Sequence, residues 1–242
     1  MERIAKIQGF RINLYTIDEV LDFLFDTKYN AHVVTVNPEI IQSAKKNKEL
    51  FDIINDAELI TPDGVGIRLA LKMKGINQEA VTGYDLTLRI LELASKRGLN
   101  IAIVGAKPEN LELAVKNINL KYEGVNVVYA HDGYFTAFDD IIASIEKSGA
   151  KFLFCAMGSP KQEFFISRLK QKLKDKQTGL VMIGVGGTID VLSGQVKLAP
   201  KFFRKIGLEW LYRTLMQPER FKRIFPTLPL FFFQSIIDSV RR

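Results

Sequence analysis

Residues 99–118 read LNIAIVGAKPENLELAVKNI, and this stretch decides the fold. Residues 99–106 form a near-continuous apolar run, which is typical of a β-strand that is buried on both faces. Residues 107–118 then place apolar side chains at helical spacing among polar ones. The stretch therefore predicts a strand that is followed directly by a helix.

The same alternation recurs along the first 196 residues. Strand-like runs stand at 32–36, 57–60, 99–106, 125–130, 151–157 and 179–186, and helical patterns at 38–54, 64–73, 107–118, 138–149 and 161–173. Strands that alternate with helices pair in parallel and are covered by helices on both sides. The sequence predicts an α/β fold, a Rossmann-like and mostly parallel sheet with helices on both faces.

Ligands of such sheets bind outside the carboxyl ends of the strands, so the residues that follow each strand are the candidates for a site. Polar or glycine-rich turns follow nearly every predicted strand, which indicates a binding crevice. These turns include Thr35 to Pro38, Thr61 to Gly64, Gly105 and Ala106, His131 to Tyr134, Gly158 to Glu163, and Gly184 to Thr188.

Asp63 is the candidate general base, in the turn TPDGVG. A carboxylate at a strand end can take a proton from a hydroxyl nucleophile, and Gly64 allows the chain to turn tightly behind it. Asp63 could equally cap the helix that begins at Gly64. Thr35 and Asn37, after a neighbouring strand, could orient a sugar beside Asp63 or make ordinary hydrogen bonds at the strand end.

The glycine-rich stretch GVGGTIDVLSG (184–194) is the candidate phosphate site. The backbone N–H groups of Gly184, Gly186 and Gly187 could approach a phosphate closely at a helix start. The spacing is not G-x-G-x-x-G, which argues against a dehydrogenase. Asp190 could accept a hydrogen bond from a base or ribose, or cap a turn.

Two further helix starts supply candidates. In GSPKQE (158–163), Pro160 suits a first helical position, Gln162 could face the crevice, and Glu163 complements the helix dipole. In GYD (83–85), Asp85 is expected to be the helix cap.

Metal and thiol chemistry are not indicated. The two histidines, His32 and His131, show no zinc-ligand spacing with Cys or Asp, and no D-x-D triplet is present. We expect no metal and no cofactor. The single cysteine, Cys155, lies in an apolar run and fits a buried core residue in a reducing compartment.

The composition changes at residue 197. Residues 1–196 hold 24 Lys and Arg and 24 Asp and Glu, whereas residues 197–242 hold ten and three, so the whole net charge of +7 lies there. Nine of the 25 aromatic residues lie there too. We expect a catalytic domain over 1–196 and a helical, membrane-associating appendage over 197–242.

Three interpretations of this appendage compete: a packed structural helix, a nucleic-acid-binding segment, and a membrane-surface segment. No motif supports nucleic acid. Phe and Trp beside Lys and Arg suit an anionic membrane surface best. The amino terminus does not read as a signal peptide and no run of about 18 apolar residues is present, so we expect a cytoplasmic, peripheral protein.

Several ordered motifs together resemble the WecG/TagA/CpsF family, glycosyltransferase family 26. They are TVNPEII, TPDGVGI, VTGYDL, GSPKQE, GVGGTIDVLSGQVKLAP and LEWLYR…PERFKR, and they cover nearly the whole chain. The resemblance implies metal-independent, inverting transfer of N-acetylmannosamine from UDP to the 4-hydroxyl of N-acetylglucosamine on undecaprenyl diphosphate, in wall teichoic acid linkage-unit synthesis.

The resemblance also implies roles for particular residues. Asp63 matches the proposed base, Thr35 and Asn37 the pocket motif, and Gln162 a conserved glutamine. The loops at Gly133–Tyr134 and Gly184–Asp190 are expected to hold UDP. Arg213, Arg220 and Arg223 match appendage arginines that complete the site over the diphosphate. Two positions depart from the pattern: Ile189 stands where phenylalanine is common and Tyr84 where a small residue is common.

Two alternatives stay open at this point. One is a transferase of the same family with another donor, such as UDP-N-acetylmannosaminuronic acid. The other is a non-catalytic, membrane-bound sensor of nucleotide sugars. Apolar surface of the appendage could be covered by lipid or by another subunit of a homo-oligomer.

Overall fold

The computed structural model describes residues 3–136, 138–200, 203, 211–212 and 221–240 of the 242-residue chain. The strands are β1 (Ile4–Ile7), β2 (Phe10–Asn13), β3 (Ala31–Val36), β4 (Leu59–Pro62), β5 (Asn100–Gly105), β6 (Asn126–His131), β7 (Phe152–Ala156) and β8 (Val181–Gly184). The helices are α1 (Ile17–Asp26), α2 (Pro38–Lys45), α3 (Lys48–Asn55), α4 (Gly64–Met73), α5 (Gly83–Arg97), α6 (Pro108–Lys121), α7 (Phe138–Ser148), α8 (Lys161–Lys172), α9 (Thr188–Leu192) and α12 (Phe221–Val240).

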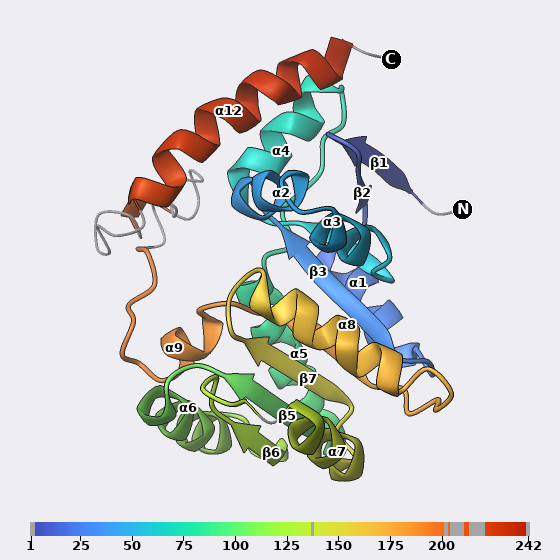
Figure 1. The fold of residues 1–242 in the computed structure, drawn as a ribbon. Coiled ribbons are helices and arrows are strands. Elements are labelled where there is room, and N and C mark those ends of the chain that lie inside the picture. The colour runs from blue at the N-terminus through green and yellow to red at the C-terminus, as the bar shows by residue number, and fades with distance from the viewer. Residues whose placement is uncertain (1–2, 137, 201–202, 204–210, 213–220, 241–242) are drawn as a thin grey trace.

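Six strands form one sheet in the order β4-β3-β8-β7-β5-β6, and every pairing in it is parallel. The predicted parallel α/β sheet is therefore confirmed. All carboxyl ends lie at one edge of the sheet, and α2, α4, α6, α8 and α9 begin there (Figure 1).

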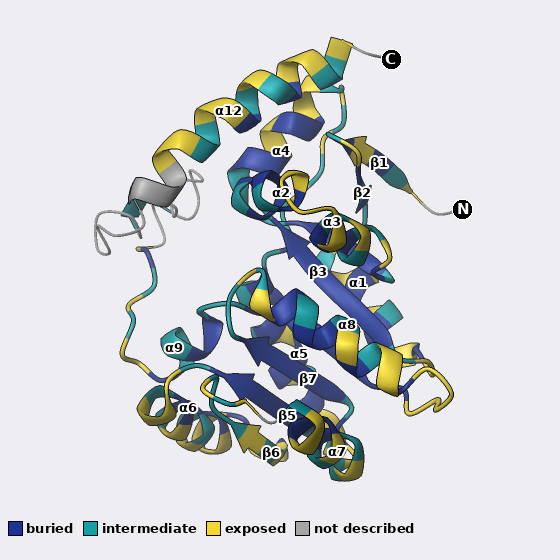
Figure 2. Ribbon diagram, in the orientation of Figure 1, coloured by how far each residue is buried: buried dark blue, intermediate teal, exposed yellow. Residues whose placement is uncertain are grey.

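Side chains of one strand alternate between two cores, because successive residues of a strand point to opposite faces. In β5, Ile101 and Ile103 pack in the core that α1, α5 and α6 cover, whereas Ala102 and Val104 pack in the core that α7 and α8 cover. A third core joins Val34 and other β3 and β4 residues to α2, α3, α4 and the β1–β2 hairpin. Figure 2 shows these buried strands in dark blue between the helices.

The predicted elements differ from the structure in a few places. The helical pattern over 38–54 is two helices, because the chain breaks after Lys45 and Asn47 caps α3 by accepting the Leu50 N–H at 3.1 Å. The fourth strand lies at 59–62 and not at 57–60, so Thr61 and Pro62 belong to β4 itself. The β1–β2 hairpin and α1 lie outside the predicted series.

Helix α12 packs on α2 and α4 (Figure 1). Phe231 is completely buried in the same core as Val34 and Ile41. Polar bonds anchor the carboxyl half of α12: Gln234 accepts from Gln42 Nε2 at 2.9 Å, and Asp238 pairs with Lys74 at 3.0 Å. The last part of the chain therefore folds onto the first part of the sheet.

Candidate functional site

The ends of β3 and β4 place Asn37 and Asp63 side by side. Val36 and Pro62 are partners in the parallel register, and the Asp63 N–H donates to the Val36 carbonyl at 2.8 Å. Each of the two residues occupies the N-cap position of the helix that follows. The Asn37 side chain caps α2 by accepting the Ile40 N–H at 3.0 Å, whereas the Asp63 side chain makes no capping hydrogen bond to α4.

The start of α5 closes over Thr35, which is buried. A β-carbon on Gly83 would lie 3.1 Å from Thr35 Oγ1 and 3.7 Å from the Gly184 carbonyl oxygen, so a larger residue would force Thr35 to shift by a few tenths of an ångström. The segment before α5 is tied to β4, because the Val81 N–H donates to the Pro62 carbonyl at 2.9 Å. Thr35, Gly83 and Gly184 therefore meet, and the sequence did not single out Gly83.

The sequence predicted that Asp85 caps α5, and this prediction is wrong. The N-cap is Thr82, whose Oγ1 accepts the Asp85 N–H at 3.0 Å and donates to Asp85 Oδ2 at 2.8 Å. Asp85 is thus the third residue of the helix. The hydroxyl of Thr82 is the better cap because it reaches the helix N–H groups from outside the first turn.

Gln162 and Glu163 link β8 to the start of α8, and both are buried. The Gly186 N–H donates to Gln162 Oε1 at 3.1 Å, and Gln162 Nε2 donates to Glu163 Oε1 at 2.9 Å. Burial raises the pKa of Glu163, and the hydrogen bond from Gln162 opposes this rise. The N-cap of α8 is Pro160, so the first helical residue is Lys161 and not the predicted proline.

The remaining glycine positions lie at the same edge of the sheet. Gly158 precedes α8 and its carbonyl accepts the Gln162 N–H at 3.0 Å. Gly105 is the last residue of β5, and Gly64 is the first residue of α4. Gly187 is the N-cap residue of α9. These residues lie at or shortly after the carboxyl ends of strands β4, β5, β7 and β8, as predicted.

Two predicted binding residues lie at the rim. Tyr134 follows β6 and is 72% exposed. Asp190, in α9, accepts from Asn110 Nδ2 of α6 at 2.6 Å, so its carboxylate joins two helices. Asn110 is a neighbour of Asp190 that the sequence did not indicate.

The arginines of the appendage lie largely outside the described structure. Arg213 and Arg220 fall outside the described residues. Arg223 belongs to α12, but its side chain is outside the description.

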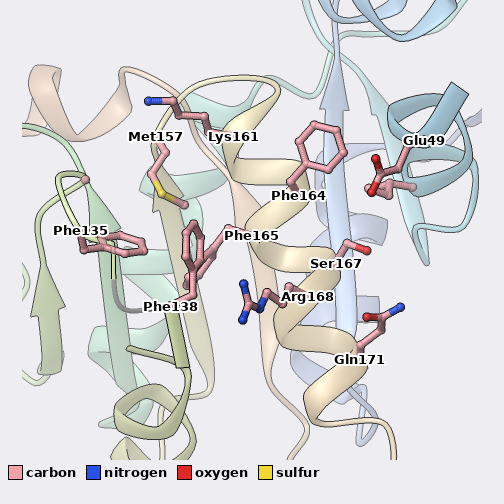
Figure 3. Close-up of a pocket in the computed structure, with 12 residues that line it drawn as sticks. Glu49, Phe135, Phe138, Met157, Lys161, Phe164, Phe165, Ser167, Arg168 and Gln171 are labelled. Carbon is pink, nitrogen blue, oxygen red and sulfur yellow. The ribbon is translucent and has the colours of Figure 1, made fainter. Parts of the chain in front are cut away.

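A hollow of about 590 Å³ lies beside this edge, along α8 (Figure 3). Figure 3 shows Phe135, Phe138 and Phe165 on one side of α8 and Phe164 on the other. Among its lining residues only Gly133 belongs to a predicted UDP loop, and Asp63, Thr35 and Gln162 are not among them. A second hollow, of about 430 Å³, is lined by Tyr84, Leu88, Val191 and Leu192 among others.

Neither hollow is lined by Asp63, Thr35 or Gln162. We therefore take the edge formed by the carboxyl ends of the strands as the candidate site.

Within the residues that the structure describes, no three His, Cys, Asp or Glu side chains are grouped so that they could hold a metal ion. In the same residues, no helix combines the length and the apolar character that crossing a bilayer requires.

Comparison with known proteins agrees with the motifs. The pattern of a family described as "Glycosyl transferase WecG/TagA/CpsF family" matches residues 5–242. The chain is similar to an N-acetylglucosaminyldiphosphoundecaprenol N-acetyl-beta-D-mannosaminyltransferase of Bacillus subtilis (strain 168), with 32% identity over 225 residues, which are 92% of this chain and 86% of that protein. A protein with the same name from Bacillus spizizenii (strain W23) is 32% identical over 200 residues, which are 82% of this chain and 76% of that protein.

Proposed function

Because the chain belongs to the WecG/TagA/CpsF family of glycosyltransferases, we propose that it transfers N-acetylmannosamine from UDP-N-acetylmannosamine to N-acetylglucosamine on undecaprenyl diphosphate. The names of the two relatives support this acceptor and this sugar. The product would be the disaccharide of the linkage unit of wall teichoic acid. The observation that carries the proposal is the position of Asp63 at the carboxyl end of β4, beside Asn37 at the end of β3.

Asp63 would act as the general base. It takes the proton of the acceptor 4-hydroxyl while that oxygen attacks the anomeric carbon from the face opposite UDP. The new C–O bond forms as the bond to the UDP oxygen breaks, so the configuration inverts. Thr35, next to the start of α5 and the end of β8, would orient the donor sugar beside this base.

Charge that develops on the leaving diphosphate must be stabilised. We assign this to the Gly187 N–H, because the N–H groups of Val185 and Gly186 already donate to Cys155 and Gln162. The arginines Arg213, Arg220 and Arg223 would share this role, with no metal ion. The anchoring of α12 supports the arginine part, because its carboxyl half is bonded near the carboxyl ends of α2 and α4, through Gln42 and Lys74. The start of α12 points back toward the edge where α2 and α4 begin (Figure 1).

The outer face of α12 supports docking on a membrane. Between residues 225 and 240, where side chains are described, its exposed residues are all apolar: Phe225, Pro226, Pro229, Leu230, Phe233, Ile236, Ile237 and Val240. Phe233 is 63% exposed and Val240 79%, and residues 224–237 carry no charge. Such a face can enter the headgroup region while neighbouring Lys and Arg contact anionic lipid. This would hold the enzyme at the inner face of the membrane, where its lipid acceptor lies.

UDP release by the full chain tests the proposal. The assay supplies the lipid-linked N-acetylglucosamine acceptor in vesicles with EDTA, and compares UDP-N-acetylmannosamine with UDP-N-acetylmannosaminuronic acid. We expect turnover with the first donor only. Turnover with the second donor would show that the chain uses UDP-N-acetylmannosaminuronic acid. Loss of turnover in EDTA would show that the reaction needs a metal ion. UDP binding without turnover would favour the non-catalytic sensor.

Arg220→Ala tests the leaving-group role in the same assay. Turnover should fall more than UDP affinity does, because the arginine would contact charge that grows in the transition state. Equal losses in turnover and in UDP affinity would remove that role.

A further inference from the structure

Glu163 is an acidic residue that the fold buries almost completely. It is only 1% exposed, and acidic residues are rarely buried so fully unless they are paired. Its Oε1 accepts from Gln162 Nε2, and within the described residues its Oε2 meets no donor at hydrogen-bond geometry. Its own N–H and the Ser159 side chain add only smaller interactions that lower its pKa. Leaving a buried carboxyl oxygen unpaired is unfavourable, so the fold retains Glu163 for some other benefit.

Helix capping is not that benefit. A glutamate at the third helical position usually accepts the N–H of the N-cap residue. Glu19 does this in α1, where the Thr16 N–H donates to its Oε2 at 2.8 Å. In α8 the N-cap is Pro160, which has no N–H to donate.

The contact with Gln162 has a geometric consequence. A carboxamide can be turned end for end with little change in shape, but its two ends differ in hydrogen bonding. The Gly186 N–H requires the oxygen end, at 3.1 Å, and Glu163 accepts only from the nitrogen end. Gly184 packs so closely that a β-carbon there would lie 2.4 Å from Gln162 Nε2. Glu163 and Gly186 together therefore fix one orientation of the Gln162 side chain.

We propose that Glu163 is a positioning residue of the transfer reaction, which acts through Gln162 to hold the Gly184–Gly187 turn in the shape that receives the donor diphosphate. This rests on the proposed function for the identity of the donor. Glu163 itself would touch no substrate, and this role goes beyond the interaction with the helix dipole that its sequence position predicts.

The arrangement tolerates either protonation state of Glu163. Burial raises the pKa of this carboxyl, yet Oε1 can accept from Gln162 whether or not Oε2 carries a proton. A glutamine at position 163 has the same shape and also offers an oxygen. Glu163→Gln should therefore preserve the orientation of Gln162, whereas Glu163→Met fills the space without an acceptor.

A double-mutant cycle on the full chain tests the proposal. The variants are Glu163→Met, Gln162→Met and the double variant, and the readouts are the calorimetric Kd for UDP and the kcat and KM of transfer. We expect Glu163→Met to weaken UDP binding about tenfold, the effect of one lost buried hydrogen bond to a charged group. The double variant should match Gln162→Met alone, because Glu163 acts only through Gln162.

The controls separate positioning from stability. Glu163→Gln should bind UDP within about threefold of the wild type. Glu19→Gln, at the same helical position of α1, should leave UDP affinity unchanged. Additive losses in the cycle, or a Glu163→Met variant that binds UDP like the wild type, would overturn the proposal.

The two proposals can fail separately. A wild-type chain that binds UDP but transfers no sugar removes the proposed function, and the cycle in UDP affinity still decides the role of Glu163. A wild-type chain that binds no UDP overturns both.

Discussion

Asn37 and Asp63 occupy equivalent places on neighbouring strands, yet their side chains are used differently. Both follow paired residues of β3 and β4, and both are N-cap residues. The Asn37 side-chain oxygen accepts a backbone N–H of α2, whereas the Asp63 side chain makes no capping hydrogen bond to α4. The difference shows that the Asn37 side chain stabilises the start of α2, whereas the Asp63 carboxylate does not cap α4.

The largest expected effect is that of Asp63→Asn. Turnover should fall by about 10²–10⁴-fold, because a carboxamide of the same shape cannot take the proton of the 4-hydroxyl of the sugar acceptor. The melting temperature should stay close to that of the wild type, since asparagine has the same shape as aspartate and α4 loses no capping bond. Steady-state kinetics and calorimetry on the same sample check both statements. A loss in turnover of less than tenfold would return Asp63 to a structural role.

Acid pH is the second largest effect, and it limits how the comparison can be measured. Burial, with a smaller contribution from Lys170, lowers the pKa of His32 on β3 to about 3 from the usual 6.5. Between these values the unfolded chain binds a proton that the folded chain does not, so stability falls as the pH drops below 6.5. At pH 4 the loss is on the order of 3 kcal/mol.

Urea unfolding at pH 7 and pH 4 measures this loss. A His32→Leu variant should lose less stability between the two pH values than the wild type does. Equal acid sensitivity of the two proteins would show that other groups dominate. The turnover of the wild type and of Asp63→Asn is therefore best compared at a pH above 6.5, where protonation of His32 does not destabilise the fold.

Thr35→Val is expected to have a smaller effect on catalysis than Asp63→Asn. The valine keeps the shape beside Gly83 but removes the hydroxyl, and a lost hydrogen bond to the donor should reduce kcat/KM up to about tenfold. Thr35→Ser, which keeps the hydroxyl, serves as the matched control. If both variants lose activity equally, packing against α5 and not the hydroxyl is what matters.

Asn37→Ala is expected to have the smallest effect. Removal of the capping bond should lower the free energy of unfolding by about 1 kcal/mol, as measured by urea denaturation at pH 7. Asn37→Ser keeps a capping oxygen and should recover most of this stability. A loss of activity in Asn37→Ser despite that recovery would give Asn37 the sugar-orienting role as well.

The fold was predictable from local patterns to a large extent. Apolar runs located all six strands of the sheet, and polar or glycine turns located their carboxyl ends. The errors concern boundaries and caps: α2 and α3 are separate helices, β4 starts two residues later, and Thr82 rather than Asp85 caps α5. Caps depend on which of several nearby side chains reaches the helix N–H groups, and spacing alone leaves that choice open.

The strand-end positions of the candidate residues were predictable, but their arrangement in space was not. The sequence indicated Asp63, Thr35, Gln162 and the glycine turn, because functional residues of parallel sheets follow the strands. It did not indicate that Gly83 closes over Thr35, or that Glu163 is buried against Gln162. Those contacts join segments that the chain folds together from separate strands.

The sequence by itself determined the parallel α/β class, the positions of the strand ends and the basic, aromatic character of the last 46 residues. These properties follow from hydrophobic period, turn residues and charge, which act within short stretches. The tertiary structure decided that β3 lies between β4 and β8, that the Asp63 side chain does not cap α4, and that α12 packs on α2 and α4. Strand order and helix docking depend on pairings between distant residues, which no local pattern encodes.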